Sequence, residues 1–326
     1  MTPSSPPFAE DLVPGVALDP APDITVDEGL AAQYLALSGD QLGPTLSAPL
    51  SFALTGRPER LANPALVISL SIGQSTVATG RVIANLRYDN LVLERQVHVG
   101  ETLRTVVTPV AAAWTRSGTD RAKVLLDMSV TTHDGERIAR YQRLALLPVR
   151  DAEVLVAGDI PGAGDAPPLS HYWSVVPSGW SNPAGVTSRP LALGSPWTDP
   201  LADTVSSARE LVRLTQNRAA AHRDARVGSG GQRLVFGGHT VALAQASLSR
   251  LAPDLLTVLA WRSCDHLAPV FEDDTLSFEI VIDAVERGRG FRIADATVRA
   301  TAHRGETKST PVLEWRPVLL LAGEAS

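Results

Sequence analysis

The stretch Leu211–Leu251 reads LVRLTQNRAAAHRDARVGSGGQRLVFGGHTVALAQASLSRL, and it joins a polar loop to a long apolar segment. The apolar segment opens with Gly237-Gly238 and repeats apolar residues at the spacing of one helical face, at Val241, Ala244, Leu248 and Leu251. Other apolar residues lie around the rest of the helical wheel, so the segment predicts a helix that is buried on nearly all sides. The first N–H groups of a helix have no internal partner, and its start can therefore hold an oxygen that gains negative charge.

The polar loop before this helix carries the residues that could perform chemistry. His222 and Asp224 lie in it, and Asn217 stands just before it. A histidine can take up or return a proton near neutral pH. An asparagine amide can orient water but cannot carry a proton at that pH, and Asp224 could supply a charge beside the histidine. We therefore predict an acid–base site at the junction of the loop and the helix.

Each of these residues also has a structural interpretation. A loop histidine is often hydrogen-bonded to the backbone, and two glycines can simply allow the chain to turn into a helix. His239, one step into the helix, is more often a packed or supporting histidine. For Gly237-Gly238 the structural and the functional interpretation can hold together.

The composition is that of a globular protein with more than one domain. The chain has 326 residues, of which 44% are hydrophobic and 20% are charged, and this length favours two domains. A net charge of −6 argues against a nucleic-acid partner. One cysteine, Cys264, excludes an intrachain disulfide framework, and the seven histidines show no spacing typical of a metal site. No run is long enough to cross a membrane and no secretory signal is visible, so we expect a cytoplasmic protein.

Two parts of the chain are similar to one another at a constant separation. Val97–Leu103 corresponds to Val270–Leu276, which lies 173 residues further on. The same separation places Pro64 on Gly237, the start of the apolar helix. Asn63 before Pro64 is itself typical of a helix start, with asparagine as the cap and proline in the first turn. This agreement across a helix and a strand predicts an internal duplication.

The pattern after that first helix, predicted over residues 65–78, changes to alternating and β-branched residues as far as residue 149, which predicts antiparallel strands. Residues 151–168 are rich in glycine and proline and predict a linker. A helix followed by antiparallel strands is typical of an α+β fold. We therefore divide the chain into a disordered tail (1–12), a first copy (13–150), the linker (151–168) and a second copy (169–326).

The residues of the polar loop carry a family resemblance. Asn217, His222, Asp224 and the Gly237-Gly238 helix start resemble the signature of the MaoC-like (R)-specific enoyl-CoA hydratases, which runs D-x-N-P-x-H-x-D before a loop and a helix start with small residues. Asn217 stands in place of the first acid, and Ala219-Ala220 replaces the Asn-Pro pair. The first copy is similar to the mesaconyl-CoA hydratase (β-methylmalyl-CoA dehydratase) branch, at its Asn63–Val67 helix start and its Arg95–Leu103 strand entry.

This resemblance implies the α+β double hot-dog fold, in which two copies of an antiparallel sheet wrap around long central helices and pair through their sheets. It also implies reversible hydration of a 2-enoyl-CoA to a 3-hydroxyacyl-CoA, with a branched or dicarboxylic acyl group as one option. The catalytic positions are then Asn217, which orients water, His222, which moves the proton, and Gly238, whose N–H holds the thioester oxygen. The supporting residues are Asp224, Gly237 and His239.

The first copy looks catalytically degenerate, because Asp40 matches the acid of the signature but Thr45 stands where the histidine belongs. We expect that copy to complete the fold and to shape the acyl or CoA channel. Two other functions stay open: a hot-dog thioesterase, and a non-catalytic acyl-CoA-binding subunit, which Asn217 favours. The expected partner is an acyl-CoA substrate, with coenzyme A as part of the substrate and no separate cofactor, no metal, no nucleic acid and no membrane. A homodimer is compatible with the sequence.

Overall fold

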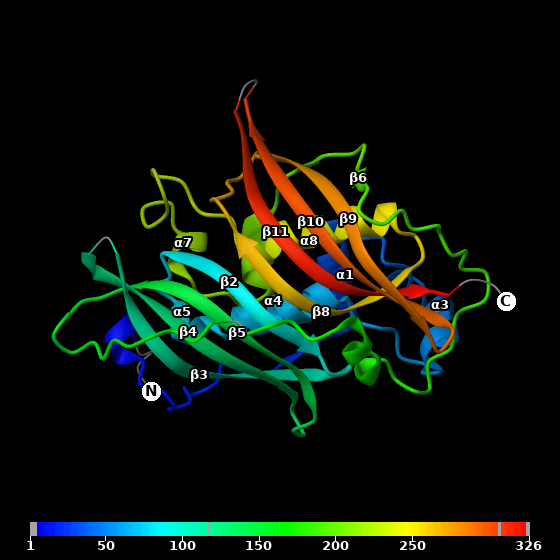
Figure 1. Cartoon of the computed structure of the whole chain (residues 1–326). Coiled ribbons are helices and arrows are strands. Elements are labelled where there is room, and N and C mark those ends of the chain that lie inside the picture. The colour runs from blue at the N-terminus through cyan, green and yellow to red at the C-terminus, as the bar shows by residue number, and fades with distance from the viewer. Residues whose placement is uncertain (1–4, 117, 163, 306–307, 324–326) are drawn as a thin grey trace.

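The computed structural model describes residues 5–116, 118–162, 164–305 and 308–323. One long antiparallel sheet wraps around two central helices, so the chain has the predicted α+β double hot-dog architecture (Figure 1). The main strands of the first half are β2 (Ala84–Leu93), β3 (Thr102–Thr115), β4 (Gly118–Thr132) and β5 (Arg137–Pro148). Those of the second half are β8 (Leu255–His266), β9 (Thr275–Gly288), β10 (Phe291–Arg304) and β11 (Lys308–Ala322).

The two halves join where β2 pairs with β8, in a register that sets Tyr88 opposite Cys264 and Leu91 opposite Trp261. Within the described residues the sheet has 11 strands, and its path runs β1-β3-β4-β5-β2-β8-β11-β10-β9-β6. Three short strands finish its edges: β1 (Ile24–Thr25), β6 (Pro196–Thr198) and β7 (Asp203–Thr204). The predicted pairing of the two copies through their sheets is therefore confirmed.

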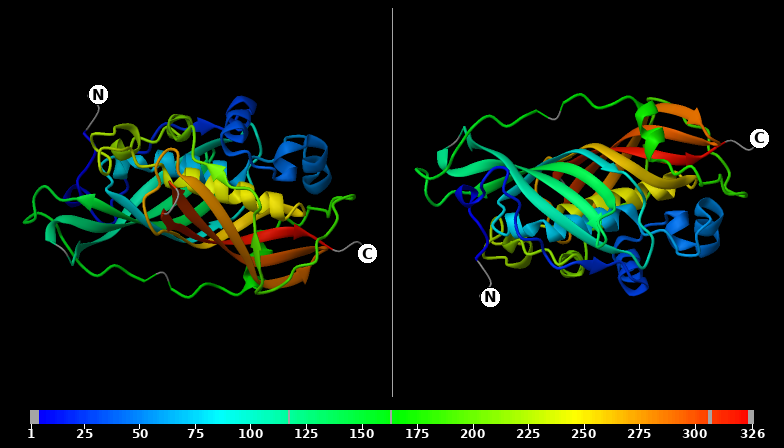
Figure 2. Two further views of the ribbon diagram at one scale, coloured as in Figure 1. Left: turned by 90° about the horizontal axis from the view of Figure 1, so that it is seen from above. Right: turned by 90° about the horizontal axis from the view of Figure 1, so that it is seen from below.

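The two central helices are α4 (Pro64–Gln74) and α8 (Gly237–Leu251), and they lie side by side on the concave face of the sheet (Figure 2). Every residue of α4 is buried, and so is most of α8. The Asn63 side chain accepts the Ala65 N–H and caps α4, as its sequence predicts. The prediction of one buried helix in each half is confirmed.

The duplication is visible in where the elements begin. Residues 64 and 237 begin the central helices, residues 102 and 275 begin β3 and β9, and residues 118 and 291 begin β4 and β10. Each of these pairs is 173 residues apart. The separation first seen between two short sequence segments thus holds for a helix and two strands of each half.

Eight shorter helices are present among the described residues: η1 (Ala9–Asp11), α1 (Glu28–Ser38), α2 (Gly43–Leu46), α3 (Ala48–Thr55), α5 (Thr76–Thr79), η2 (Leu169–Val175), α6 (Ala208–Leu214) and α7 (Ala220–Arg223). The proline and glycine residues between residues 39 and 60 are typical of a loop, yet two helices form there. The reason is that α3 is capped by Ser47 and buries Leu54 against Leu61 and Leu256.

The prediction of a disordered tail is also wrong for residues 5–12, while residues 1–4 lie outside the described part of the chain. Ala9 is fully buried, and Leu12 is nearly so. The Phe8 ring lies under the Arg81 guanidinium, 4.2 Å from its centroid, and Arg81 also donates to the Pro6 carbonyl. The apolar positions in this segment therefore bind it to the first half.

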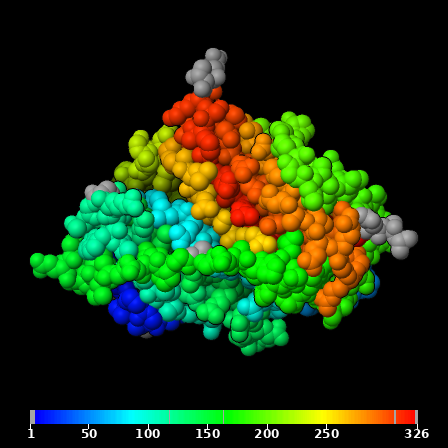
Figure 3. Space-filling view, viewed as in Figure 1, coloured from blue at the N-terminus to red at the C-terminus, as the bar shows by residue number. Residues whose placement is uncertain are grey.

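Residues 151–168 form an extended connection without helix or strand among those described, and they run over the outer face of the molecule from one half to the other (Figure 3). Gly158 donates to the Ala112 carbonyl, and Arg262 donates to the Pro167 carbonyl. None of the described helices combines the length and the apolar character that crossing a bilayer requires.

Candidate active site

A cavity of about 820 Å³ lies between the two halves, at the N-terminal end of α8. The first half contributes residues of β2 and β5, and the second half contributes the loop around α7, the start of α8 and the end of β8. Its lining residues are Arg81, Val82, Ile83, Ala84, Asn85, Leu86, Tyr88, Arg143, Pro148, Ala220, Ala221, His222, Val227, Gly228, Ser229, Leu234, Val235, Phe236, Gly237, Thr240, His266, Leu267, Ala268, Pro269 and Val270. A mostly apolar wall with a few polar groups is typical of a small-molecule site.

His222 lies on α7 and faces this cavity. Its Nδ1 is 3.0 Å from the Leu234 carbonyl oxygen, and because a carbonyl can only accept, Nδ1 carries the proton in the neutral ring. Nε2 then has a free lone pair, and it has no hydrogen-bond partner within the described residues. Burial lowers the pKa of His222 to about 4, and the charge of Arg143 adds to this effect, against the opposing hydrogen bond to Leu234. At neutral pH His222 is therefore available as a base.

The start of α8 forms part of the cavity wall at Gly237, while Gly238 is buried one residue deeper and is not among the lining residues. A Cβ atom on Gly237 would lie 2.5 Å from Cε1 of His266. A Cβ atom on Gly238 would lie 2.5 Å from the Phe236 ring and 3.0 Å from Oγ of Ser69. Neighbouring side chains therefore require both glycines, and the role of the Gly238 N–H toward a thioester oxygen stays a prediction.

Asn217, predicted to orient water, is 1% exposed and is not among the lining residues. Its Oδ1 accepts the Ala219 N–H at 2.9 Å, and its carbonyl accepts from Arg223. These contacts hold the chain where it enters α7, so the structure brings His222 and Gly237 together at the cavity and gives Asn217 a position behind them.

The two remaining predicted residues lie outside the lining as well. Asp224 pairs with Arg226 at 2.7 Å, and hydrogen bonds from Arg226 lower the pKa of Asp224 to about 2. This ion pair lies within the loop, and the supporting role of Asp224 in the reaction stays a prediction. His239 is 1% exposed on α8, and neither of its ring nitrogens has a hydrogen-bond partner in the described chain.

Known proteins place this arrangement in a family. No family model matches the chain. A β-methylmalyl-CoA dehydratase from Chloroflexus aurantiacus is 26% identical over 82% of this chain and 80% of its own length, and a mesaconyl-CoA hydratase from Cereibacter sphaeroides is 27% identical over 86% and 84%. The solved structure of a conserved hypothetical protein from Mycobacterium tuberculosis, described as a double hotdog fold, is 35% identical over 97% of this chain and 98% of its own, with a TM-score of 0.76. The chain belongs to the MaoC-like double hot-dog family.

In this MaoC-like chain, the motif pointed to His222 but not to the polar groups opposite it. Arg143 on β5 is 3% exposed, and it has no carboxylate partner within the described residues. Its Nε donates to Asn85 Oδ1 at 2.6 Å, and its Nη1 donates to the hydroxyls of Ser75 and Thr79 at 2.8 and 3.1 Å. Nothing in the strand pattern of the first copy marks these residues as functional, because only folding brings them to the second copy's loop.

No aspartate or glutamate is present among the described residues that line the cavity. Nor do those residues, or the rest of the described chain, place three or more His, Cys, Asp or Glu side chains where they could hold a metal ion. The Arg143 guanidinium is therefore hydrogen-bonded to neutral groups, and no carboxylate in the cavity wall neutralises its charge. A buried charge without a partner is costly, so this wall is suited to an anionic group of a ligand.

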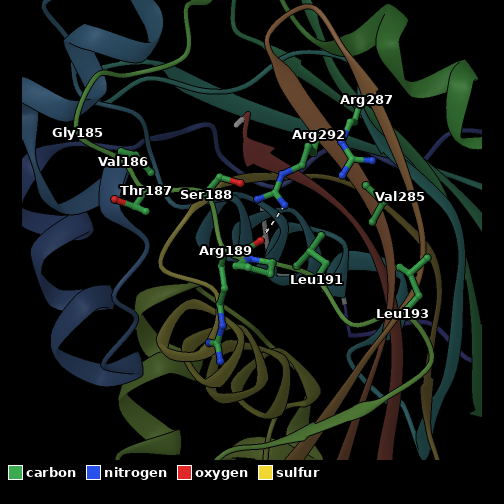
Figure 4. A pocket seen from close by; sticks show the side chains of 11 residues that line it. Gly185, Val186, Thr187, Ser188, Arg189, Leu191, Leu193, Val285, Arg287 and Arg292 are labelled. Atoms are coloured by element: carbon green, nitrogen blue, oxygen red, sulfur yellow. Dashed lines mark hydrogen bonds between the residues drawn. The ribbon is translucent and has the colours of Figure 1, made fainter. Parts of the chain in front are cut away.

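A second cavity, of about 660 Å³, lies between residues 185–193 and the sheet beyond the C-terminal end of α8 (Figure 4). It also contains a buried arginine, Arg292, but this one is fully paired. Its three nitrogens donate to the carboxylate of Asp254 and to the carbonyl oxygens of Ala322 and Arg189. Arg292 thus has a carboxylate partner, whereas the hydrogen bonds of Arg143 go to an amide and two hydroxyl groups.

The first copy's counterpart of the motif is used for structure. Oδ2 of Asp40 accepts from Asn63 and Gln245, both at 2.6 Å, and Oδ1 accepts from Ser249 at 2.7 Å. This buried carboxylate therefore connects the caps of α1 and α4 to α8 of the other half. With its oxygens occupied and Thr45 in place of histidine, this position in the family fold has no free acid–base group.

Proposed function

We propose that this chain is a hydro-lyase that reversibly adds water to a 2-enoyl-CoA and gives a 3-hydroxyacyl-CoA. The observation that carries the proposal is His222, an imidazole with a free Nε2 in a cavity at the start of a buried helix. The activities by which the two curated relatives are named, on β-methylmalyl-CoA and mesaconyl-CoA, are of the same reaction type.

In the forward reaction, Nε2 of His222 takes a proton from water while the water oxygen bonds to the β-carbon. The electron pair of the carbon–carbon double bond moves toward the thioester oxygen. The N–H groups of Gly237 and Gly238, at the positive end of α8, favour the negative charge that develops there. His222 then gives the same proton to the α-carbon, so that one water molecule is added and nothing else is consumed. Dehydration follows the same steps in reverse.

The acyl group we propose carries a carboxylate of its own. Arg143 and Asn85 face the cavity from β5 and β2, and Nδ2 of Asn85 is buried without a hydrogen-bond partner in the described chain. A carboxylate could accept from both side chains and would supply the charge that Arg143 lacks. Mesaconyl-CoA, the substrate named for one relative, has such a group.

Incubation of the purified protein with mesaconyl-CoA and with crotonyl-CoA tests this function. We expect loss of the enoyl absorbance without release of free thiol. His222→Ala should reduce kcat by about 10²–10⁴-fold, whereas His171→Ala, an exposed histidine in η2 outside the cavity, should not. Near-wild-type turnover by the His222 variant would exclude its role as the base.

The same pair of substrates tests the carboxylate. Arg143→Met should raise KM for mesaconyl-CoA much more than for crotonyl-CoA, because only the first substrate has the second anion. An equal effect on the two substrates would mean that Arg143 serves the cavity wall and not the substrate. The circular dichroism and melting temperature of this variant should be compared with those of wild type, because Arg143 also holds Asn85 and Ser75.

A non-catalytic acyl-CoA-binding subunit is the competing function, and the position of Asn217 behind the cavity wall favours it. A subunit of this kind would bind both thioesters and change neither. A thioesterase would instead release free thiol, because water would attack the carbonyl carbon. The assay with the two thioesters therefore separates all three functions.

A further inference from the structure

We propose that His266 donates a hydrogen bond to the thioester oxygen at the start of α8, and so completes the site for the developing negative charge. This inference rests on the proposed function, since it assigns a second substrate-contacting residue to the same reaction. His266 is the last residue of β8 and lines the same cavity as His222. It belongs to no part of the sequence signature.

The first observation is the contact between His266 and the helix start. A Cβ atom on Gly237 would lie 2.5 Å from Cε1 and 2.6 Å from Nε2 of His266, so the imidazole edge occupies the space that any other side chain at 237 would need. Gly237 is the first residue of α8. An oxygen held by the first N–H groups of this helix would therefore meet the imidazole as well.

The second observation is that the imidazole of His266 has no hydrogen-bond partner within the described residues. Its Nε2 is buried and unpaired. The ring is held by packing instead: Tyr88 meets it edge-on, with the ring centroids 6.1 Å apart and the ring planes at 78°. Buried polar atoms in folded proteins nearly always have a partner, so an imidazole without one beside a cavity indicates a partner that arrives with the ligand.

The third observation is the charge around the ring. Among the described lining residues, the charged and titratable groups are Arg81, Tyr88, Arg143, His222 and His266, and no acid is present. Burial, with smaller contributions from Arg143 and His222, lowers the pKa of His266 to about 4. The ring is thus neutral at pH 7. A neutral imidazole keeps its N–H and can polarise a carbonyl oxygen by hydrogen bonding.

The two histidines then have separate tasks, and the proton balance is unchanged. His222 takes the proton from water and delivers it to the α-carbon. His266 keeps its own proton throughout and only shares it with the thioester oxygen, most strongly when that oxygen is negative. Because this interaction is stronger in the transition state than in the bound substrate, its loss should lower kcat more than it changes KM.

The kinetic test uses His266→Leu and His266→Gln, with the exposed His171→Ala as the matched control. The leucine variant has no donor and should lose about 100- to 1,000-fold in kcat, as is typical when one oxyanion donor is removed. The glutamine variant retains an N–H donor and should recover part of that loss. If the glutamine variant were as inactive as the leucine variant and the control were unaffected, or if the leucine variant kept wild-type kcat, the inference would be wrong.

A spectroscopic arm separates this inference from the proposed function. Butyryl-CoA, labelled with ¹³C at the thioester carbonyl, has no double bond to hydrate, and infrared difference spectra report the stretch of its carbonyl group when bound. In wild type we expect this stretch at lower frequency than in free butyryl-CoA, and His266→Leu should reverse most of that shift. This result would support the inference even if crotonyl-CoA and mesaconyl-CoA were not hydrated. A wild-type stretch equal to that of the free thioester, or one that His266→Leu leaves unchanged, would overturn it.

Gly237→Ala provides an independent check of the contact. The added methyl group must displace the imidazole, because the ring edge already fills its position. The variant should therefore lose both kcat and the carbonyl shift, as His266→Leu does. If thermal melting shows that Gly237→Ala is unfolded, the two His266 variants still decide the question.

Discussion

The carbonyl oxygen of Thr215 lies 1.9 Å from the position that a Cβ atom on Gly73 would take. Gly73 belongs to α4 of the first half, and Thr215 comes two residues before Asn217 in the second half. The neighbour of Gly73 is thus the backbone that leads into α7, so the first half determines where the His222 loop begins.

Gly73→Ala should therefore affect both stability and activity. Its methyl group would collide with main-chain atoms, which cannot rotate away, and overpacking of this kind costs about 1–3 kcal/mol. We expect a lower urea midpoint and a reduced kcat for the best enoyl-CoA substrate. Gly135→Ala, in an exposed turn where a Cβ atom would meet nothing within 4 Å but φ is +94°, is the control for simple loss of a glycine. A Gly73 variant with wild-type stability would mean that the loop moves freely.

Asn217 should act through the loop. Its Oδ1 accepts the Ala219 N–H, and Asn217→Asp preserves an acceptor at that position, whereas Asn217→Ala removes it. We expect the aspartate variant to retain or raise activity. The alanine variant should lose activity together with about 1 kcal/mol of stability, as is typical for the loss of a cap. Chemical denaturation and kcat measured on the same samples check this, and an alanine variant that loses activity at unchanged stability would give Asn217 a direct role.

The fold could be predicted because the same local patterns, a helix start followed by strands, occur in both halves of the sequence. Asn63-Pro64 and Gly237-Gly238 both begin apolar helices, and the strands that follow them begin at the same separation in each half. The region around α3 could not be predicted in this way. Its proline and glycine residues are typical of a loop. The helix is stabilised by the burial of Leu54 against the second half, a contact that exists only in the folded chain.

The sequence predicted the site residues on one side of the cavity and not those on the other. The motif contains His222, and its spacing from the Gly237 helix start is enough to place the two together. Arg143 and Asn85 reach the cavity through the pairing of β2 with β5, and His266 reaches it at the end of β8. These contacts join residues far apart in sequence, so no local pattern could indicate them.

The pH dependence of the reaction should reflect the environment of His222. It acts as a base, so kcat/KM should be constant near neutral pH and fall only as the pH drops through about 4, the pKa of His222 in the fold. Burial is the main cause, and Arg143 contributes. Removal of that charge in Arg143→Met should raise the pKa of His222 and move the acidic limb to higher pH. A wild-type limb near 6.5, measured with crotonyl-CoA, would contradict the assignment.

His239 offers a test of stability against pH that does not involve the cavity. Burial lowers the pKa of His239 to about 4, against the opposing charge of Glu210. Between about pH 4 and pH 6.5, His239 is therefore neutral in the folded protein but protonated in the unfolded chain. The folded pKa is thus below the unfolded one, and stability is complete above about 6.5 and falls as the pH drops toward 4. At pH 5 the loss should be on the order of 2 kcal/mol for one such histidine.

His239→Leu should remove this part of the loss. The equivalent position in the first half, 173 residues earlier, is Leu66, which is fully buried in the same part of its helix, so leucine suits the backbone. Urea unfolding at pH 7 and pH 5 should show a smaller drop in the free energy of unfolding for the variant than for wild type. His222 and His266, whose pKa values are lowered in the same way, will keep part of the dependence in both proteins. An equal drop in the two proteins would show that His239 takes up its proton in the folded state as readily as in the unfolded chain.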